Sequence, residues 1–253
     1  MDNFVPNHSI VRKIWSNTDV VLFIFAGAAA QFSVNKTVDW LYFTGKLPND
    51  PLGRLFSTVA YAQKILFSST EKANLAIDQI TQIHQHVEAA RDSKIPDWAY
   101  RDVLFMLIDY SIRSFELLER KLNEAEKNEV VHVFCRVGSR MNISKLPHNY
   151  SEFQLIYAED LQHNIAYGNF SKDLFKQYKK HLGLGRYFLM KKVQSVLVPL
   201  EVKHLLKLSN GFGVKTLIYC YKILKMMSLN ELLKVMILPK AYQMQIKNIA
   251  ALS

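Results

Sequence analysis

An arginine and a threonine lie one helical turn apart in the segment DPLGRLFSTVAYAQ, residues 50–63. Asp50 followed by Pro51 is typical of a helix start, because it supplies an N-cap residue and a proline in the first turn. Arg54 then falls in the first turn, where a cation opposes the helix dipole at a cost of a few tenths to about 1 kcal/mol. Thr58 follows one turn later on the same face. A guanidinium and a hydroxyl at this spacing need a ligand or partner that explains them.

A histidine follows in the next predicted helix, residues 69–92. One face of this helix carries mainly apolar residues at three- and four-residue spacing, namely Ala73, Ala76, Ile77, Ile80, Ile83, His84 and Val87. We therefore expect His84 on the buried face, among isoleucines. His86 lies about 200° further around the helix, so the two histidines cannot chelate one metal ion. Taken alone, a single histidine on an apolar face is more often a core residue than a ligand.

A second candidate for metal binding is the E-x-x-H motif of Glu129 and His132. Together with Asp160 and His163, it would suggest a di-iron centre in a helical bundle. A ferritin-like site uses two E-x-x-H motifs and two further inward glutamates, and Glu129 with His132 supplies one such motif. His132 also lies within the apolar segment VVHVFCRV, which favours a core position. A di-iron carboxylate protein is an alternative interpretation.

The elements that must position these residues are all predicted to be helices. Start signals are Asp50-Pro51, Ser68 with Glu71, and Asn123 with Glu126. Helices are expected at about 19–33, 52–67, 69–92, 96–122, 124–141, 150–168, 171–182, 186–207 and 213–237. The sequence shows no alternating strand pattern, no low-complexity linker and no internal repeat. We expect an all-α protein with a single multi-helix domain over residues 1–253.

Composition favours a globular protein with an uneven charge. Of the 253 residues, 49% are hydrophobic and 21% are charged, which excludes a disordered chain. Cys135 and Cys220 are too few for a disulfide framework, so a reducing compartment such as the cytoplasm is expected, with both as buried small apolar side chains. Residues 1–170 hold 17 Lys and Arg against 19 Asp and Glu, whereas residues 171–253 hold 15 against 3. This asymmetry indicates either an anionic partner, such as nucleic acid or a membrane surface, or a basic solvated face without a partner.

Two segments concern membranes. The apolar stretch VVLFIFAGAAA, residues 20–30, is too short to span a bilayer and is expected to be a buried helix. The basic carboxy-terminal helices expected at 213–253 include TLIYCYKILKMMSLNELLKVMILPK, and basic amphipathic helices can lie in a membrane interface. A non-enzymatic helical protein that docks on anionic membrane surfaces is thus a further alternative. Nucleic-acid binding is not expected, because no known binding module is recognisable.

Arg54-x-x-x-Thr58, followed 26 residues later by His84 in QIHQHVEAA, has the layout of a known family. The chain resembles the fungal endoplasmic-reticulum-bound oxygenase of mycophenolic acid biosynthesis, MpaB, and the bacterial latex-clearing rubber oxygenases. The similarity covers about residues 8–208, through IVRKIWSN, NDPLGRLFSTVAYAQKILF, AIDQITQIHQHVEAAR, IPDWAYRDVLFMLIDYSIRSFELL, ISKLPHNYSEF and LGLGRYFLMKKVQSVLVP.

The resemblance implies an all-helical protein with a globin-like core around haem b. Members of the family use dioxygen to cleave or oxidise carbon–carbon double bonds in isoprenoid chains. By this resemblance, His84 is the axial ligand of the haem iron. Arg54 and Thr58 are the candidate catalytic residues beside it, the arginine facing a haem propionate and the threonine lining the pocket. The resemblance thus implies a haem-dependent oxygenase that acts on an apolar, olefinic or lipid substrate, with peripheral membrane association compatible with such a substrate.

The chain also departs from the family in two places. Rubber oxygenases carry a lysine just before the threonine, where this chain has Ser57, and a second histidine three residues before the axial one, where it has Thr81. Polyisoprene is therefore not the expected substrate. The chain has no C-x-x-C-H motif, so the haem is expected to be held non-covalently.

Overall fold

The computed structural model describes residues 2–45 and 49–209, together with residues 213, 214, 216, 218, 219, 221 and 222. Its helices are α1 (Ile10–Ser16), α2 (Thr18–Val34), α3 (Val38–Phe43), α5 (Pro51–Leu66), α6 (Thr70–Arg91), α7 (Asp97–Leu118), α8 (Glu124–Arg140), α9 (Tyr150–Asn164), α10 (Asn169–Leu197) and α11 (Leu200–Leu205). Within this part of the chain, extended pairing is confined to two isolated bridges, Asn3 with Ser69 and Asn35 with Ile165. The all-α prediction is confirmed.

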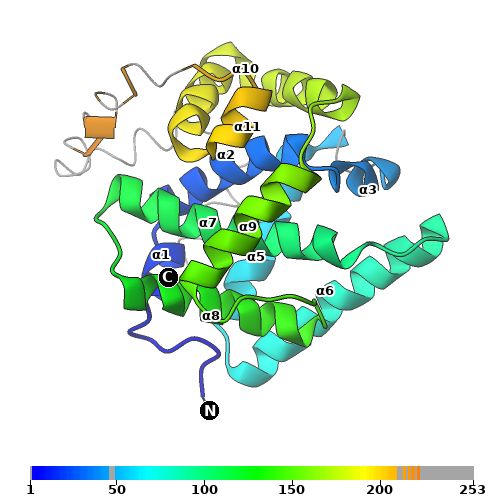
Figure 1. Ribbon diagram of the computed structural model, residues 1–253, viewed down its shortest axis with the longest axis vertical. Coiled ribbons are helices and arrows are strands. Elements are labelled where there is room, and N and C mark those ends of the chain that lie inside the picture. The colour runs from blue at the N-terminus through cyan, green and yellow to red at the C-terminus, as the bar shows by residue number, and fades with distance from the viewer. Residues whose placement is uncertain are drawn as a thin grey trace.

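The helices pack around α2 and α7. α10 packs along α2, α8 and α9 pack on α7, and α5 packs against α6. In Figure 1, α10 and α11 lie at the top over α2, α9 crosses in front of α7, and α6 runs diagonally to the right edge of the molecule. A continuous set of buried apolar side chains connects these helices. The domain limits and the globin-like arrangement of the core stay predictions.

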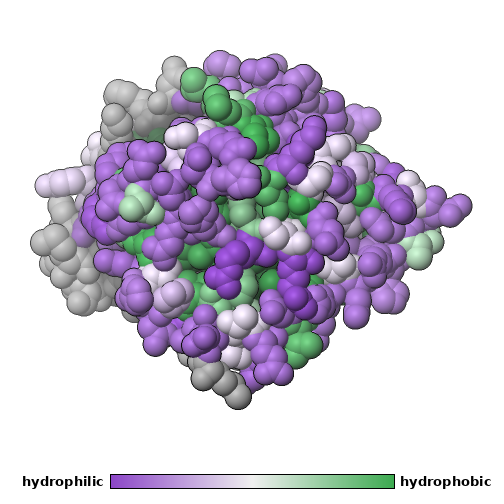
Figure 2. Space-filling model, turned by 60° about the horizontal axis from the view of Figure 1, so that its bottom comes forward, coloured by the Kyte–Doolittle hydropathy of each residue, from purple (hydrophilic) through white to green (hydrophobic). Residues whose placement is uncertain are grey.

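Several polar side chains inside the core form hydrogen bonds with one another. The indole N–H of Trp15 donates to Ser111 Oγ at 3.0 Å. Gln31 Oε1 accepts hydrogen bonds from the hydroxyls of Tyr110 at 2.8 Å and Tyr157 at 2.6 Å, which joins α2, α7 and α9. Because an unpaired buried polar group is costly, these bonds favour a single arrangement of the three helices. The face of the molecule shown in Figure 2 is mainly hydrophilic, with smaller hydrophobic areas between the polar side chains.

The apolar stretch at residues 20–30 is a buried helix, as predicted. It forms most of α2, where Val20 and Ala30 have no exposed surface. No single helix in the described part of the chain is long and apolar enough to cross a membrane. α1 and α2 pass such a test only when they are taken together, and they meet at an angle of 86°.

The predicted helix limits need several corrections. Two short helices, α1 and α3, were not predicted, because six or seven residues are too few to show a clear helical period. The helix predicted at 150–168 ends at Asn164. The next residue, Ile165, forms an isolated bridge with Asn35, which directly follows α2. The expected break between 182 and 186 is present as a non-helical Gly183, with φ of 74°, inside α10. The helix predicted at 186–207 is interrupted by Pro199, after which α11 begins.

Two of the three predicted start signals are confirmed. Asp50 accepts from the Gly53 N–H at 2.9 Å, and Asn123 forms a capping box with Glu126. The third is displaced by one residue, because Ser69 rather than Ser68 caps α6. Cys135 is buried with a free thiol, as predicted. Cys220, the predicted helix at 213–237 and the basic 213–253 region lie wholly or largely outside the described residues.

The helices α5 and α6 are joined by three residues, 67–69, and form a helical hairpin. Arg54 lies 12 residues before the end of α5, and His84 lies 14 residues after the start of α6. At about 1.5 Å per residue, these positions are about 18 Å and about 21 Å from the turn. The hairpin therefore brings Arg54 and His84 to the same level.

Candidate functional site

Arg54 and Thr58 are in direct contact in the structure. Arg54 Nη1 donates to Thr58 Oγ1 and to Ser57 Oγ, both at 3.0 Å. The two hydroxyls in turn donate to the Arg54 carbonyl, at 3.3 Å from Thr58 and 2.8 Å from Ser57. The guanidinium is therefore folded along α5, away from the amino-terminal end of the helix that would repel it. Ser57, which takes the place of the family's lysine, is part of this contact.

The charge of Arg54 is not balanced by a carboxylate in the described part of the chain. An ion pair would bring a carboxylate oxygen within 4 Å of the guanidinium. None of the ion pairs between described residues includes Arg54. Burial lowers the pKa of Arg54, because a desolvated cation is less stable than one in water. The hydroxyls of Ser57 and Thr58 accept hydrogen bonds from the guanidinium, but they do not neutralise its positive charge. A partly buried guanidinium of this kind is suited to receive an anionic ligand.

His84 is half-buried, but its surroundings differ from those predicted. Ala73, Ala76 and Ile77 of the predicted stripe are buried, whereas Ile83 is 46% exposed. The expectation that His84 lies on the buried face among isoleucines is met only in part, because Ile77 is buried and Ile80 is partly buried against the core, whereas Ile83 is exposed. Its closest aromatic neighbour is Tyr100 from α7, in an edge contact with 5.0 Å between ring centroids. The prediction of one buried face is wrong for the second half of α6, because the described helices cover only part of that face.

The two ring nitrogens of His84 have different surroundings. Nδ1 is enclosed by protein and has no hydrogen-bond partner among the described residues, whereas Nε2 is not one of the enclosed polar atoms that lack a partner. The pKa of His84 is lowered to about 4, first by burial and then by the nearby Arg54 charge, with a smaller opposite effect of Glu88. The imidazole is therefore neutral at pH 7, which is the form that binds metals. The influence of Arg54 also shows that the hairpin places these two predicted site residues near each other.

His86 behaves as predicted for a residue outside the site. It is exposed, and its Nδ1 lies 2.6 Å from the Gln82 carbonyl oxygen on its own helix. The structure therefore separates the two neighbouring histidines of QIHQHVEAA: one is enclosed beside Arg54, and the other faces outward.

The sequence analysis missed two residues that contact this site. Glu88 lies one turn after His84, and its Oε1 accepts from the Tyr100 hydroxyl at 3.1 Å and from the Ile95 N–H at 2.9 Å. Glu88 could have been noticed from its four-residue spacing to His84. Tyr100 had no such signal, because only the packing of α7 on α6 brings it to the histidine.

The residues of the di-iron alternative do not come together. Among the described residues, no three His, Cys, Asp or Glu side chains form a group that could hold a metal ion. His132 is exposed rather than in the core, with Nε2 2.7 Å from the His148 carbonyl. Asp160 instead forms a bidentate ion pair with Arg101, at 2.7 and 2.9 Å. His163 is exposed at the end of α9.

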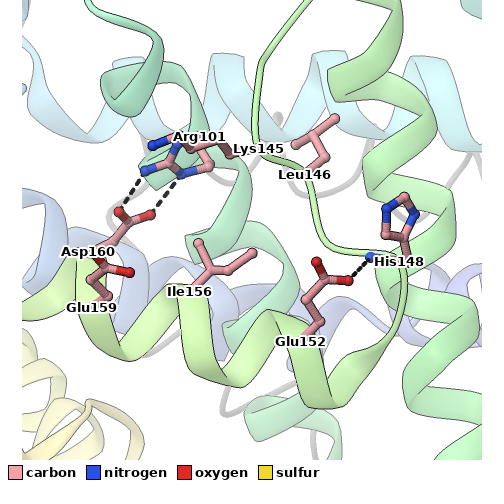
Figure 3. Close-up of a pocket in the computed structure, with 8 residues that line it drawn as sticks. All are labelled: Arg101, Lys145, Leu146, His148, Glu152, Ile156, Glu159 and Asp160. Atoms are coloured by element: carbon pink, nitrogen blue, oxygen red, sulfur yellow. Dashed lines mark hydrogen bonds and ion pairs between the residues drawn. The ribbon is translucent and has the colours of Figure 1, made fainter.

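That ion pair lines a cavity of about 400 Å³ (Figure 3). Its wall is formed by Arg101, Lys145, Leu146, His148, Glu152, Ile156, Glu159 and Asp160. Figure 3 shows Glu152 directed to the backbone N–H of His148, a bond of 2.7 Å, while Arg101 and Asp160 face each other. Because Arg101 is already paired with Asp160 and the cavity contains none of Arg54, Thr58 and His84, we do not assign the candidate site to this cavity.

Comparison with known proteins assigns the chain to a family. Residues 12–217 match the family model described as "ER-bound oxygenase mpaB/B'/Rubber oxygenase, catalytic domain". No curated protein and no solved structure matches the chain. The match covers most of the chain and includes α5, α6 and the residues described above. The chain therefore belongs to the family of ER-bound and rubber oxygenase catalytic domains.

Proposed function

We propose that this protein is an oxygenase that depends on non-covalently bound haem b and uses dioxygen on an apolar, olefinic, isoprenoid or lipid substrate. The family supports the oxygenase class. The observation that carries the haem proposal is the juxtaposition of a neutral, unpartnered imidazole with a guanidinium that no described carboxylate neutralises. A haem group needs both kinds of side chain, one for its iron and one for its propionates.

The residues present fit such a group. His84 would hold the iron through Nε2, because Nδ1 is the nitrogen turned into the protein. Arg54 would pair with a propionate, and Thr58 would keep the guanidinium oriented through the 3.0 Å hydrogen bond. When bound, the haem would supply the iron at which dioxygen is activated. The protein's own contribution would be binding, orientation and access for an apolar substrate.

The direct test is a visible spectrum of the purified protein during titration with haemin. We expect a saturable Soret band with one haem per chain, and oxygen consumption when an olefinic lipid is added. Protein that stays colourless at haemin saturation would contradict the haem proposal and favour the non-enzymatic alternative. Bound iron without porphyrin would favour the di-iron alternative.

A membrane surface is the second part of the proposal, and one surface of α10 favours it. Leu184 and Phe188 lie one turn apart, after the break at Gly183, and are 70% and 64% exposed. The Lys192 ammonium lies 5.3 Å from the centre of the Phe188 ring, and Lys180, before the break, is also exposed. Exposed apolar side chains flanked by lysines suit the interface of an anionic bilayer. Apolar substrates partition into the same phase.

This surface can be tested separately from the haem site. We expect binding to vesicles that contain anionic phospholipid, weakening between about 0.1 M and about 1 M salt, where the screening length falls from about 10 Å to about 3 Å. Joint replacement of Leu184 and Phe188 by Gln should reduce binding further. Leu155→Gln is the matched control, because Leu155 is 74% exposed on α9. Equal loss in the control, or no binding at low salt, would contradict membrane docking by α10.

A further inference from the structure

Three side chains from three helices act on the imidazole of His84. Arg54 from α5 and Glu88 from α6 act on it by charge, with opposite signs. Tyr100 from α7 contacts the ring directly, edge to face. Of these three side chains, only Glu88 has a carboxylate, which is an acidic group that can accept a hydrogen bond from the imidazole. The enclosed Nδ1 meanwhile has no partner.

Glu88 is held in place by two donors on the same oxygen. The Tyr100 hydroxyl and the Ile95 N–H both bind Oε1, at 3.1 and 2.9 Å. Its second oxygen, Oε2, accepts no hydrogen bond from a described residue. Glu88 is therefore anchored by one oxygen to the start of α7 and keeps the other free to accept.

The spacing of His84 and Glu88 allows a direct bond between them. Residues four apart on a helix have Cβ atoms about 5–6 Å apart, so rotation of the two side chains brings a carboxylate oxygen to an imidazole nitrogen. A histidine that binds a metal through one nitrogen almost always donates its other N–H to a carboxylate, carbonyl or water. This second bond selects the tautomer and raises the basicity of the ligating nitrogen.

We propose that Glu88 is the acceptor for the Nδ1–H of His84, and that Tyr100 is a positioning residue that fixes both side chains. The proton stays on Nδ1, a carboxylate oxygen of Glu88 accepts its hydrogen bond, and the lone pair of Nε2 is left for the ligand. This inference rests on the proposed role of His84 as a haem ligand. The proposed site then includes a carboxylate–histidine pair. Both of its members, Glu88 and His84, lie on α6, and Tyr100 of α7 holds the carboxylate.

Glu88→Gln is the decisive variant, because the amide oxygen can still accept from Tyr100 and Ile95 while the carboxylate charge is lost. We expect the haem-free protein to melt at an unchanged temperature. The dissociation constant for haem should rise about 10-fold to 100-fold, as for other partners of metal-bound histidines. The iron–histidine stretching frequency of the ferrous protein should fall, because His84 becomes a weaker donor.

Tyr100→Phe and two controls complete the test. Tyr100→Phe keeps the ring contact but removes one of the two donors that hold Glu88, so it should produce the same spectral shift to a smaller extent. Glu124→Gln and Tyr167→Phe change exposed residues of other elements and should leave both readouts unchanged. A wild-type Soret band with unaltered affinity and stretching frequency in Glu88→Gln would overturn this inference and leave the haem proposal intact. Failure of the wild type to bind haem would overturn both.

Discussion

Replacing Arg54 by alanine should have a small effect on the haem-free protein and a large effect on the haem-loaded protein. In the haem-free protein the variant loses two hydrogen bonds from Nη1, worth about 0.5–1.5 kcal/mol each. Ser57 and Thr58 still donate to the carbonyl of residue 54, so neither hydroxyl is left unpaired. The loss is offset by removal of a desolvated cation and of its conflict with the helix dipole. We expect the free energy of unfolding to change by less than about 1 kcal/mol.

The haem-loaded protein should lose much more. Hydrogen bonds to charged groups contribute about 1.5–3 kcal/mol, and a propionate deprived of Arg54 would lose such a contact. At about 1.4 kcal/mol per tenfold change, the dissociation constant for haem should rise about 10-fold to 100-fold. Arg54→Lys should restore only part of this, since a point charge does not reproduce the planar fork of a guanidinium.

The assay combines a haemin titration, followed at the Soret band, with thermal melting before and after loading. Arg140→Ala is the matched control, because Arg140 is a partly exposed arginine whose partner is Asp78 on α6. It should leave haem affinity unchanged. An Arg54→Ala protein with wild-type haem affinity would refute the anion-binding role. Loss of more than about 2 kcal/mol in the haem-free state would show instead that Arg54 supports the fold.

Four further substitutions test other parts of the structure. His84→Ala should abolish stable haem binding, whereas His86→Ala should leave it nearly intact, because His86 is exposed and turned outward; equal loss in both would exclude His84 as the specific ligand. Thr58→Val should keep the fold and haem binding but alter the rate of oxygen consumption, and an unchanged rate would remove Thr58 from the candidate catalytic residues. Gly27→Ala should cost about 1–3 kcal/mol by overpacking, because the added Cβ would lie 2.3 Å from Tyr110 Cδ1; calorimetry that finds wild-type stability would contradict the close helix packing described here.

The sequence by itself determined the local features of this protein. Asp50 and Asn123 start their helices as predicted, since a cap depends on residues within one turn. The contact between Arg54 and Thr58 follows from their four-residue spacing in the same way. The order and spacing of the short motifs around these residues also sufficed to indicate the family, which the match over residues 12–217 confirms.

The tertiary structure decided which side chains are covered and by what. The apolar spacing in α6 predicted one buried face, but Ile83 on that face is exposed while His84 is half-buried against Tyr100. Periodicity defines a face relative to the axis of one helix, and it carries no information on how far along the helix a neighbour extends. The second half of α6 reaches the edge of the molecule, where less of the protein covers it (Figure 1).

The same reasoning applies to the site as a whole. Arg54, His84 and Tyr100 belong to three successive helices, and no spacing rule relates them. A three-residue turn brings the first two to one level, and the packing of α7 adds the third. The loss of water around the three side chains then shifts the pKa of Arg54 and His84 and leaves Nδ1 without a partner. Residue types are a property of the sequence, whereas desolvation arises only when separate helices pack together.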